Sequence, residues 1–162
     1  MKAKLDAHAS AAELASAYGE VANELLAAEY FEAAEPFYLH AQAEAPDDAR
    51  WPYYLGHLYT SRAMTDKAPA SFERSLLLRP GDIATRVWLG NIYLDQGQPE
   101  RAEPLFEQAI VAQPGVVAAL FGSGRAALAK RNYAVAVDRF ERALAADARA
   151  TVVHYPLALA YR

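Results

Sequence analysis

The histidines of the chain lack the spacing that a metal site needs. They are His8, His40, His57 and His154, and no two of them share a helix face at a spacing of three or four residues. The sequence has no His-Glu-x-x-His segment and no cysteine, which rules out the common zinc-ligand patterns, disulfides and cysteine nucleophiles together. We therefore expect no metal site.

The segments that contain glycine and serine do not predict catalysis either. Gly122-Ser123-Gly124 lacks the G-x-S-x-G spacing of a hydrolase and falls within an expected helix. Neither Gly81-Asp82 nor Gly90-Asn91 is followed by the G-x-x-x-x-G-K-[ST] pattern of a phosphate loop. The carboxylates that we expect on a solvated outer face are Glu100, Glu103 and Glu107. We assign no catalytic residue and no cofactor, and we predict that the chain is not an enzyme.

The composition of the chain excludes several classes of protein. The 162 residues carry a formal net charge of -4 and are 54% hydrophobic, as in folded globular proteins. The basic excess of proteins that bind DNA or anionic membranes is missing, and no apolar run approaches the roughly 18 residues of a membrane span. No apolar core follows the charged residues 1–6, so we expect no signal peptide. We expect a soluble chain without a nucleic-acid partner or membrane insertion; its compartment stays open between the cytoplasm and the periplasm of a bacterium.

The most informative pattern is a period of 34 residues. Pro46, Pro80 and Pro114 keep this step, and small or aromatic residues keep it in four further series. The series are Ala34, Ala68, Ala102 and Ala136; Tyr38, Phe72, Phe106 and Phe140; Ala41, Ser75, Ala109 and Ala143; and Ala22, Gly56, Gly90 and Gly124. A fixed period of about 20–50 residues indicates a stack of repeated units, each of which buries its apolar face only against its neighbours.

Each copy predicts two helices. In the third copy Gly97 supplies backbone freedom at a helix end, and Pro99 can begin the next helix. Gly90 and Ala102 allow the two helices to approach closely, and Phe106 fills the space toward the next pair. The expected helices cover residues 11–28, 31–45, 49–62, 65–78, 83–96, 99–112, 117–130, 133–146 and 151–162.

Two local features refine the helix ends. Ser10 and Glu13 fit a capping box that opens the first helix. Pro36, Pro69 and Pro104 lie in or just after the first turn of the second helix of their copies. Because proline cannot donate a helix hydrogen bond, we predict a local bend or a late helix start there, on the outer side of the stack.

The repeated residues resemble the 34-residue tetratricopeptide repeat. Leu55-Gly56-x-x-Tyr59, Ala68-x-x-x-Phe72 and Pro80 follow its signature, and Leu89-Gly90-x-x-Tyr93, Ala102-x-x-x-Phe106 and Pro114 follow it again. The signature tryptophan is displaced, to Trp51 and Trp88, and the first and fourth copies are more degenerate. The resemblance implies an all-α fold, a right-handed superhelical solenoid of antiparallel helix pairs. It also implies a protein-binding scaffold.

The period divides the chain into a lead-in, four copies and a partial fifth, all within one domain. The lead-in covers residues 1–14, the copies cover 15–48, 49–82, 83–116 and 117–150, and the first helix of a fifth copy covers 151–162. The last helix is apolar over much of its surface. Either the chain is a docking or regulatory fragment of a longer protein, or helix 151–162 pairs with a second copy in a homo-oligomer.

By the same resemblance, the first helix of each copy lines a concave groove. The residues that we expect to contact a partner there are Tyr53, His57, Asn91, Phe121, Arg125 and Tyr155. Other inward places hold Leu94, Asp95, Leu128 and Ala129. Aromatic and arginine side chains are typical anchors of protein interfaces, so we predict a protein or peptide ligand in the groove. The alternative is a structural or self-associating module whose groove stays empty.

The resemblance also allows one family function to be tested on the residues. Members that bind the acidic tails of chaperones hold the terminal carboxylate with lysine and arginine at fixed places of three consecutive copies. Counted from the first copy, the places that need a cation hold Gly19, Ala84 and Trp88. The other two possible frames lack the cations as well, so we expect weak or no binding to such tails.

Overall fold

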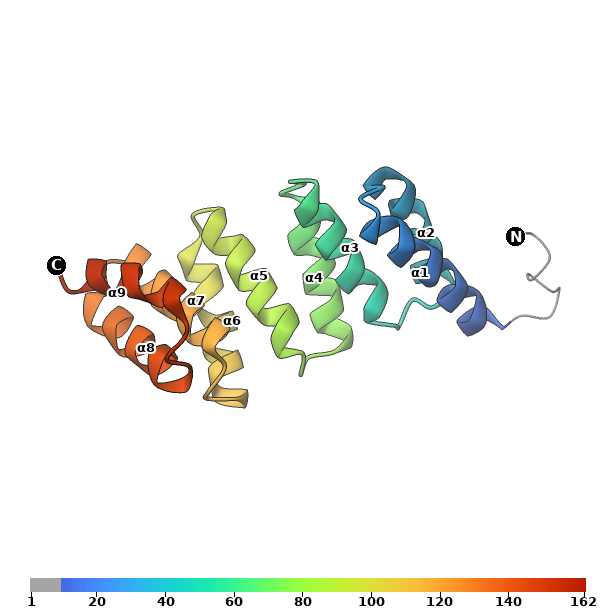
Figure 1. Cartoon of the computed structure of the whole chain (residues 1–162). Coiled ribbons are helices and arrows are strands. Elements are labelled where there is room, and N and C mark those ends of the chain that lie inside the picture. The colour runs from blue at the N-terminus through green and yellow to red at the C-terminus, as the bar shows by residue number, and fades with distance from the viewer. Residues whose placement is uncertain (1–9) are drawn as a thin grey trace. The chain divides into compact units, whose positions relative to one another are not determined.

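The computed structural model describes residues 10–162, and its described residues form helices and no strands (Figure 1). The helices are α1 (Ala11–Ala27), α2 (Phe31–Glu44), α3 (Arg50–Ser61), α4 (Lys67–Leu78), α5 (Ile83–Asp95), α6 (Pro99–Ala112), α7 (Val117–Ala129), α8 (Tyr133–Ala146) and α9 (His154–Ala160), the last preceded by the short 3₁₀ helix η2 (Thr151–Val153). Every predicted helix is confirmed, and nearly all ends agree within two residues. The signal-peptide expectation and most of the lead-in lie outside the described residues.

The chain divides into two compact units. Unit 1 ends at Gly81 and contains the helix pairs α1–α2 and α3–α4, while unit 2 covers Asp82–Arg162 and contains α5–α6, α7–α8 and α9. Within each unit, consecutive helices joined by short turns pack side by side (Figure 1). The all-α fold of paired helices is confirmed. The right-handed superhelical path, and the division into four copies and a partial fifth within one domain, stay predictions.

In the pairs α3–α4, α5–α6 and α7–α8, an aromatic ring of the second helix lies against a glycine of the first. A Cβ atom added to Gly56 would lie 2.7 Å from the ring of Phe72, and one added to Gly124 would lie 2.5 Å from the ring of Phe140. These separations are far shorter than van der Waals contact, so only glycine allows the two helices to approach this closely. Both rings are fully buried.

Phe106 shows how one pair is joined to the next within unit 2. Its ring lies against Gly90 of its own pair, where an added Cβ would be 2.7 Å away, and also against Gly122 on α7. This confirms that Phe106 fills the space between two pairs. In unit 1 the ring of Trp51 on α3 takes a similar place against Gly19 on α1.

The turn inside each pair has one conformation in all four copies. The second residue after the end of the first helix has a positive φ in each copy. These residues are Glu29 (62°), Ala63 (53°), Gly97 (70°) and Arg131 (59°). The backbone N–H of the residue that follows donates across the turn, as from Gln98 to the Tyr93 carbonyl at 2.8 Å. This arrangement is the Schellman motif, which satisfies carbonyls at a helix end. The freedom predicted for Gly97 is therefore used, and three copies adopt the same conformation without glycine.

The capping box is confirmed, whereas the proline prediction is partly wrong. The Ser10 hydroxyl accepts from the Glu13 N–H at 3.3 Å, and the Ser10 N–H donates to the Glu13 carboxylate at 2.7 Å. Pro36 and Pro104 cause no late start, because α2 and α6 begin five residues before them. Both prolines are exposed, so water can reach the carbonyl left without a donor. A bend there stays a prediction.

Pro69 differs from the other two prolines. It is buried rather than on the outer side, contrary to the prediction. It is the third residue of α4. At that position a helix residue has no partner for its N–H, so proline costs no hydrogen bond and its ring can pack inward.

We expect Ala63→Gly to stabilise unit 1. Alanine at positive φ carries a steric cost of about 1–2 kcal/mol, and the greater freedom of glycine in the unfolded chain offsets part of the relief. The free energy of unfolding, measured in urea, should rise by about 0.5–1 kcal/mol. The matched control is Ala17→Gly on the exposed face of α1, which should lower it by about the same amount. Equal effects of the two substitutions would contradict the turn assignment.

Candidate functional site

Unit 1 places Tyr53 and His57 on successive turns of α3, packed against each other. Their rings meet edge to face with centroids 4.5 Å apart, and the His57 ring meets the Phe72 ring in the same way at 5.2 Å. Both side chains are half-buried, and burial lowers the pKa of His57 below its ordinary value of 6.5. Much of their surface therefore serves the packing of α3 on α4.

Unit 2 brings three of the predicted residues together around one pocket. Phe121 and Arg125 on α7 and Tyr155 on α9 line a cavity of about 370 Å³. The other residues that line it are Leu94, Leu128, Ala129, Pro156 and Leu159. The walls are thus mostly apolar and come from α5, α7 and α9, the helices that begin successive copies.

Arg125 supplies the positive charge of this pocket. One Nη atom donates to the Asn91 side-chain oxygen at 3.2 Å, and the other donates to the Asp95 carboxylate at 3.0 Å. Its guanidinium also lies 5.9 Å from the centre of the Phe121 ring. Asn91, the fourth predicted residue of this unit, therefore orients Arg125 rather than lining the pocket.

The prediction missed two lining residues, Pro156 and Leu159. Leu159 occupies the ninth place of the partial fifth copy, the same place that Asn91 and Arg125 occupy in their copies. The 34-residue period could therefore have predicted that Leu159 lines the pocket. Pro156 is the third residue of α9, and it does not stand at a repeat place that we assigned to the groove.

The described residues hold no group of three or more histidine or acidic side chains that could bind a metal ion. Among these residues, no helix is both long and apolar enough to cross a membrane. The chemistry that the pocket offers is therefore an apolar surface with one guanidinium at its edge.

Known proteins share this architecture. A tetratricopeptide repeat family model matches residues 89–161. The solved structure of MamA from Desulfovibrio magneticus RS-1 (residues 41 to the end) is 20% identical, covers 91% of this chain and 84% of its own, and superposes with a TM-score of 0.86. The family match covers residues 89–161, which is less than half of the chain, and it supports a tetratricopeptide repeat assignment.

Two further tetratricopeptide-fold structures are similar. YrrB, described as having an unusual peptide-binding site, is 23% identical over 89% of this chain and 74% of its own, with a TM-score of 0.79. PilF from Pseudomonas aeruginosa is 18% identical over 93% of this chain and 68% of its own, also with a TM-score of 0.79. At these identities the likeness establishes the fold alone. No curated protein sequence matches the chain.

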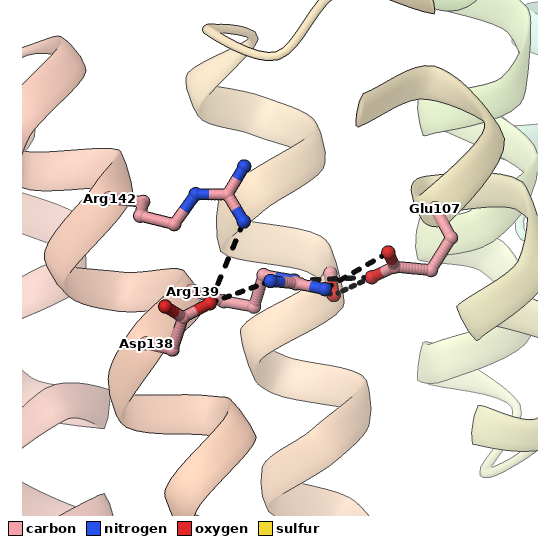
Figure 2. Close-up of polar contacts among 5 residues, drawn as sticks. Glu107, Asp138, Arg139 and Arg142 are labelled. Carbon is pink, nitrogen blue, oxygen red and sulfur yellow. Dashed lines mark hydrogen bonds and ion pairs between the residues drawn. The ribbon is translucent and has the colours of Figure 1, made fainter. Parts of the chain in front are cut away.

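A polar cluster joins three helices of unit 2 (Figure 2). The Arg139 guanidinium donates to both carboxylate oxygens of Glu107, at 3.2 and 3.1 Å, and the Ser123 hydroxyl donates to the same carboxylate at 2.6 Å. Arg139 also pairs with Asp138 at 2.6 Å. Glu107 is thus half-buried and bonded to two neighbouring helices. Glu103 is also half-buried and pairs with Lys130 at 2.5 Å, so the expected place of both carboxylates on a solvated outer face was wrong.

Ser123 is committed to this cluster. It lies within α7, as predicted, and it is 2% exposed, between two glycines that both pack against phenylalanine rings. A hydroxyl that donates to a carboxylate and is shielded from solvent is a structural group rather than an accessible nucleophile. Tetratricopeptide repeats are in general protein-interaction modules without enzymatic activity, and this cluster holds three helices of unit 2 together.

His57 should make unit 1 sensitive to mild acid. Because its pKa is lowered in the folded state, the unfolded chain binds more protons between that value and pH 6.5. Its contribution is therefore complete above about pH 6.5 and is lost as the pH falls below that. We expect His57→Gln to reduce the stability difference between pH 7.5 and pH 5 in urea unfolding. His154→Gln, at an exposed position, is the control; the same reduction in both variants would contradict this account.

Proposed function

We propose that the chain is a non-enzymatic scaffold and that unit 2 binds a segment of a partner protein in the pocket of Phe121, Arg125 and Tyr155. The observation that carries the proposal is the pocket itself, an apolar cavity of about 370 Å³ with a single charged group among its lining residues. Apolar walls with a few placed polar groups are typical of ligand sites.

The exposure of the pocket residues supports a peptide as ligand. Tyr155 is 74% exposed although its ring is large and apolar, and Phe121 and Arg125 are half-buried. Tyrosine and arginine are enriched among residues that dominate protein interfaces. The pocket is open on one side rather than enclosed, so an extended segment can insert one side chain while the rest of it runs along the helices.

Tyr53 and His57 of unit 1 have a smaller role in the proposed binding. Their mutual packing and their contacts with Phe72 leave each of them half-buried, so we assign them a smaller share of partner contact than the residues of unit 2. The compartment in which the partner is met stays open.

Filling the pocket should weaken binding. We would select peptides of twelve residues from a random displayed library on the intact chain and measure their affinity by fluorescence anisotropy. Ala129 is exposed at the end of α7 and lines the pocket, so Ala129→Phe adds bulk there without removing core packing. We expect at least about a tenfold loss of affinity, as for blocking a central anchor site.

The matched control is Ala118→Phe, the same substitution at an exposed position of the same helix outside the pocket. It should change the affinity less than about twofold, and circular dichroism should be the same for both variants. Selected peptides that bind the two variants equally well would show that the pocket is not the binding site.

A second candidate is self-association through residues 151–162. It is favoured by the exposed apolar side chains Val152 (59%), Tyr155 (74%) and Tyr161 (63%). Exposed apolar groups gathered in one segment mark association sites. We expect the weight-average mass in sedimentation equilibrium to rise with concentration and to stay at the monomer value for the double variant Val152→Ser and Tyr161→Ser. A wild-type chain that stays monomeric up to about millimolar concentration would exclude this candidate.

A further inference from the structure

The edge of the pocket carries one cation that is only partly satisfied. Arg125 is the only charged residue among those that line the cavity. A guanidinium has five N–H donors in a fixed fork. Two hydrogen bonds join it to the neighbouring helix, to Asn91 and Asp95, so further donors remain for a ligand.

Asn91 and Asp95 differ in charge and in exposure to solvent. Asn91 is neutral and half-buried, and it bonds one Nη atom. Asp95 is the last residue of α5, and its side chain is 69% exposed. An ion pair this exposed adds little to stability, because water screens it and both side chains lose freedom in forming it. The Asp95 carboxylate can therefore be exchanged for another carboxylate at small cost.

Resting on the proposed function, we propose that Asp95 is a placeholder, meaning that its carboxylate occupies the position on Arg125 that a ligand carboxylate takes on binding. The pocket then selects a protein segment in which an acidic residue flanks an apolar side chain. The apolar side chain enters among Phe121, Leu128 and Leu159, and the flanking carboxylate replaces that of Asp95 on the guanidinium. Asn91 keeps Arg125 directed at the pocket during the exchange. Charge complementarity of this kind sets specificity more than total affinity.

The test compares three peptides of the form Gly-Ser-Leu-Leu-X-Ser-Gly, in which X is Asp, Asn or Lys. Acetylated and amidated ends remove the terminal charges, so that only the side chain at X differs. Affinities are measured by NMR titration of the intact, isotope-labelled chain. We expect the Asp peptide to bind about fivefold more tightly than the Asn peptide and the Lys peptide to bind most weakly, with the preference falling as salt is raised.

The distinctive expectation is a gain of affinity on substitution. Asp95→Asn removes the competing carboxylate and should tighten binding of the Asp peptide by up to about fivefold, with less than about twofold change for the Asn peptide. In an Arg125→Gln chain the preference for Asp should disappear, and adding Asp95→Asn should then change nothing. Glu100→Gln is the control, an equal change of charge at an exposed position of α6 that does not line the pocket.

The outcomes separate the two proposals. An unchanged affinity of Asp95→Asn for the Asp peptide overturns the placeholder, and so does an equal gain in Glu100→Gln, which would reflect overall charge alone. If the Asp and Asn peptides bind the pocket equally well, the pocket still binds peptides and only the acidic preference is wrong. If none of these peptides and none of the library peptides shifts the pocket resonances, the proposed function itself fails.

Discussion

Every helix pair depends on the contact between a residue with little or no side chain on its first helix and an aromatic ring on its second. Gly56, Gly90 and Gly124 fill this role in three copies, and even one added carbon atom would collide with the ring opposite. In the first copy Ala22 and Tyr38 stand at the corresponding places and are both fully buried. The close approach lets the ring fill the space between the two helices, and neighbouring pairs cover the apolar surface that one pair of short helices cannot bury alone.

This contact is the reason that the sequence predicted the fold so closely. A glycine that lies against a ring leaves no room for a side chain, so glycine recurs in three of the four copies, each time with phenylalanine opposite. The helix ends followed in the same way from Ser10 and Gly97, whose roles are local. The prediction of a late helix start at proline, which failed, also concerned a local feature. The position of Pro104 in α6 depends on whether solvent can reach the freed carbonyl, and spacing alone does not reveal that.

The candidate site was predicted less completely, because it depends on which side chains bond one another. The period placed Asn91 and Arg125 at the same position of successive copies, but it did not show that the first orients the second. Spacing also gave no reason to separate Glu107 from other surface carboxylates. Its partners Ser123 and Arg139 come from the two helices that follow, at places where other copies hold different residues.

The ninth place of the copies illustrates how a constant scaffold carries a variable surface. It lies next to the glycine position, yet it is occupied by Asn23, His57, Asn91, Arg125 and Leu159 in turn. The Asn23 side chain accepts a hydrogen bond from Tyr38, the His57 ring packs on Tyr53, and Arg125 reaches a pocket. In three copies the neighbouring place holds a glycine at which an added Cβ would collide with a ring, whereas the ninth place holds side chains of very different size. Differences in surface chemistry between the copies therefore arise at positions of this kind, and the single guanidinium among them gives unit 2 a chemistry that unit 1 does not offer at this place.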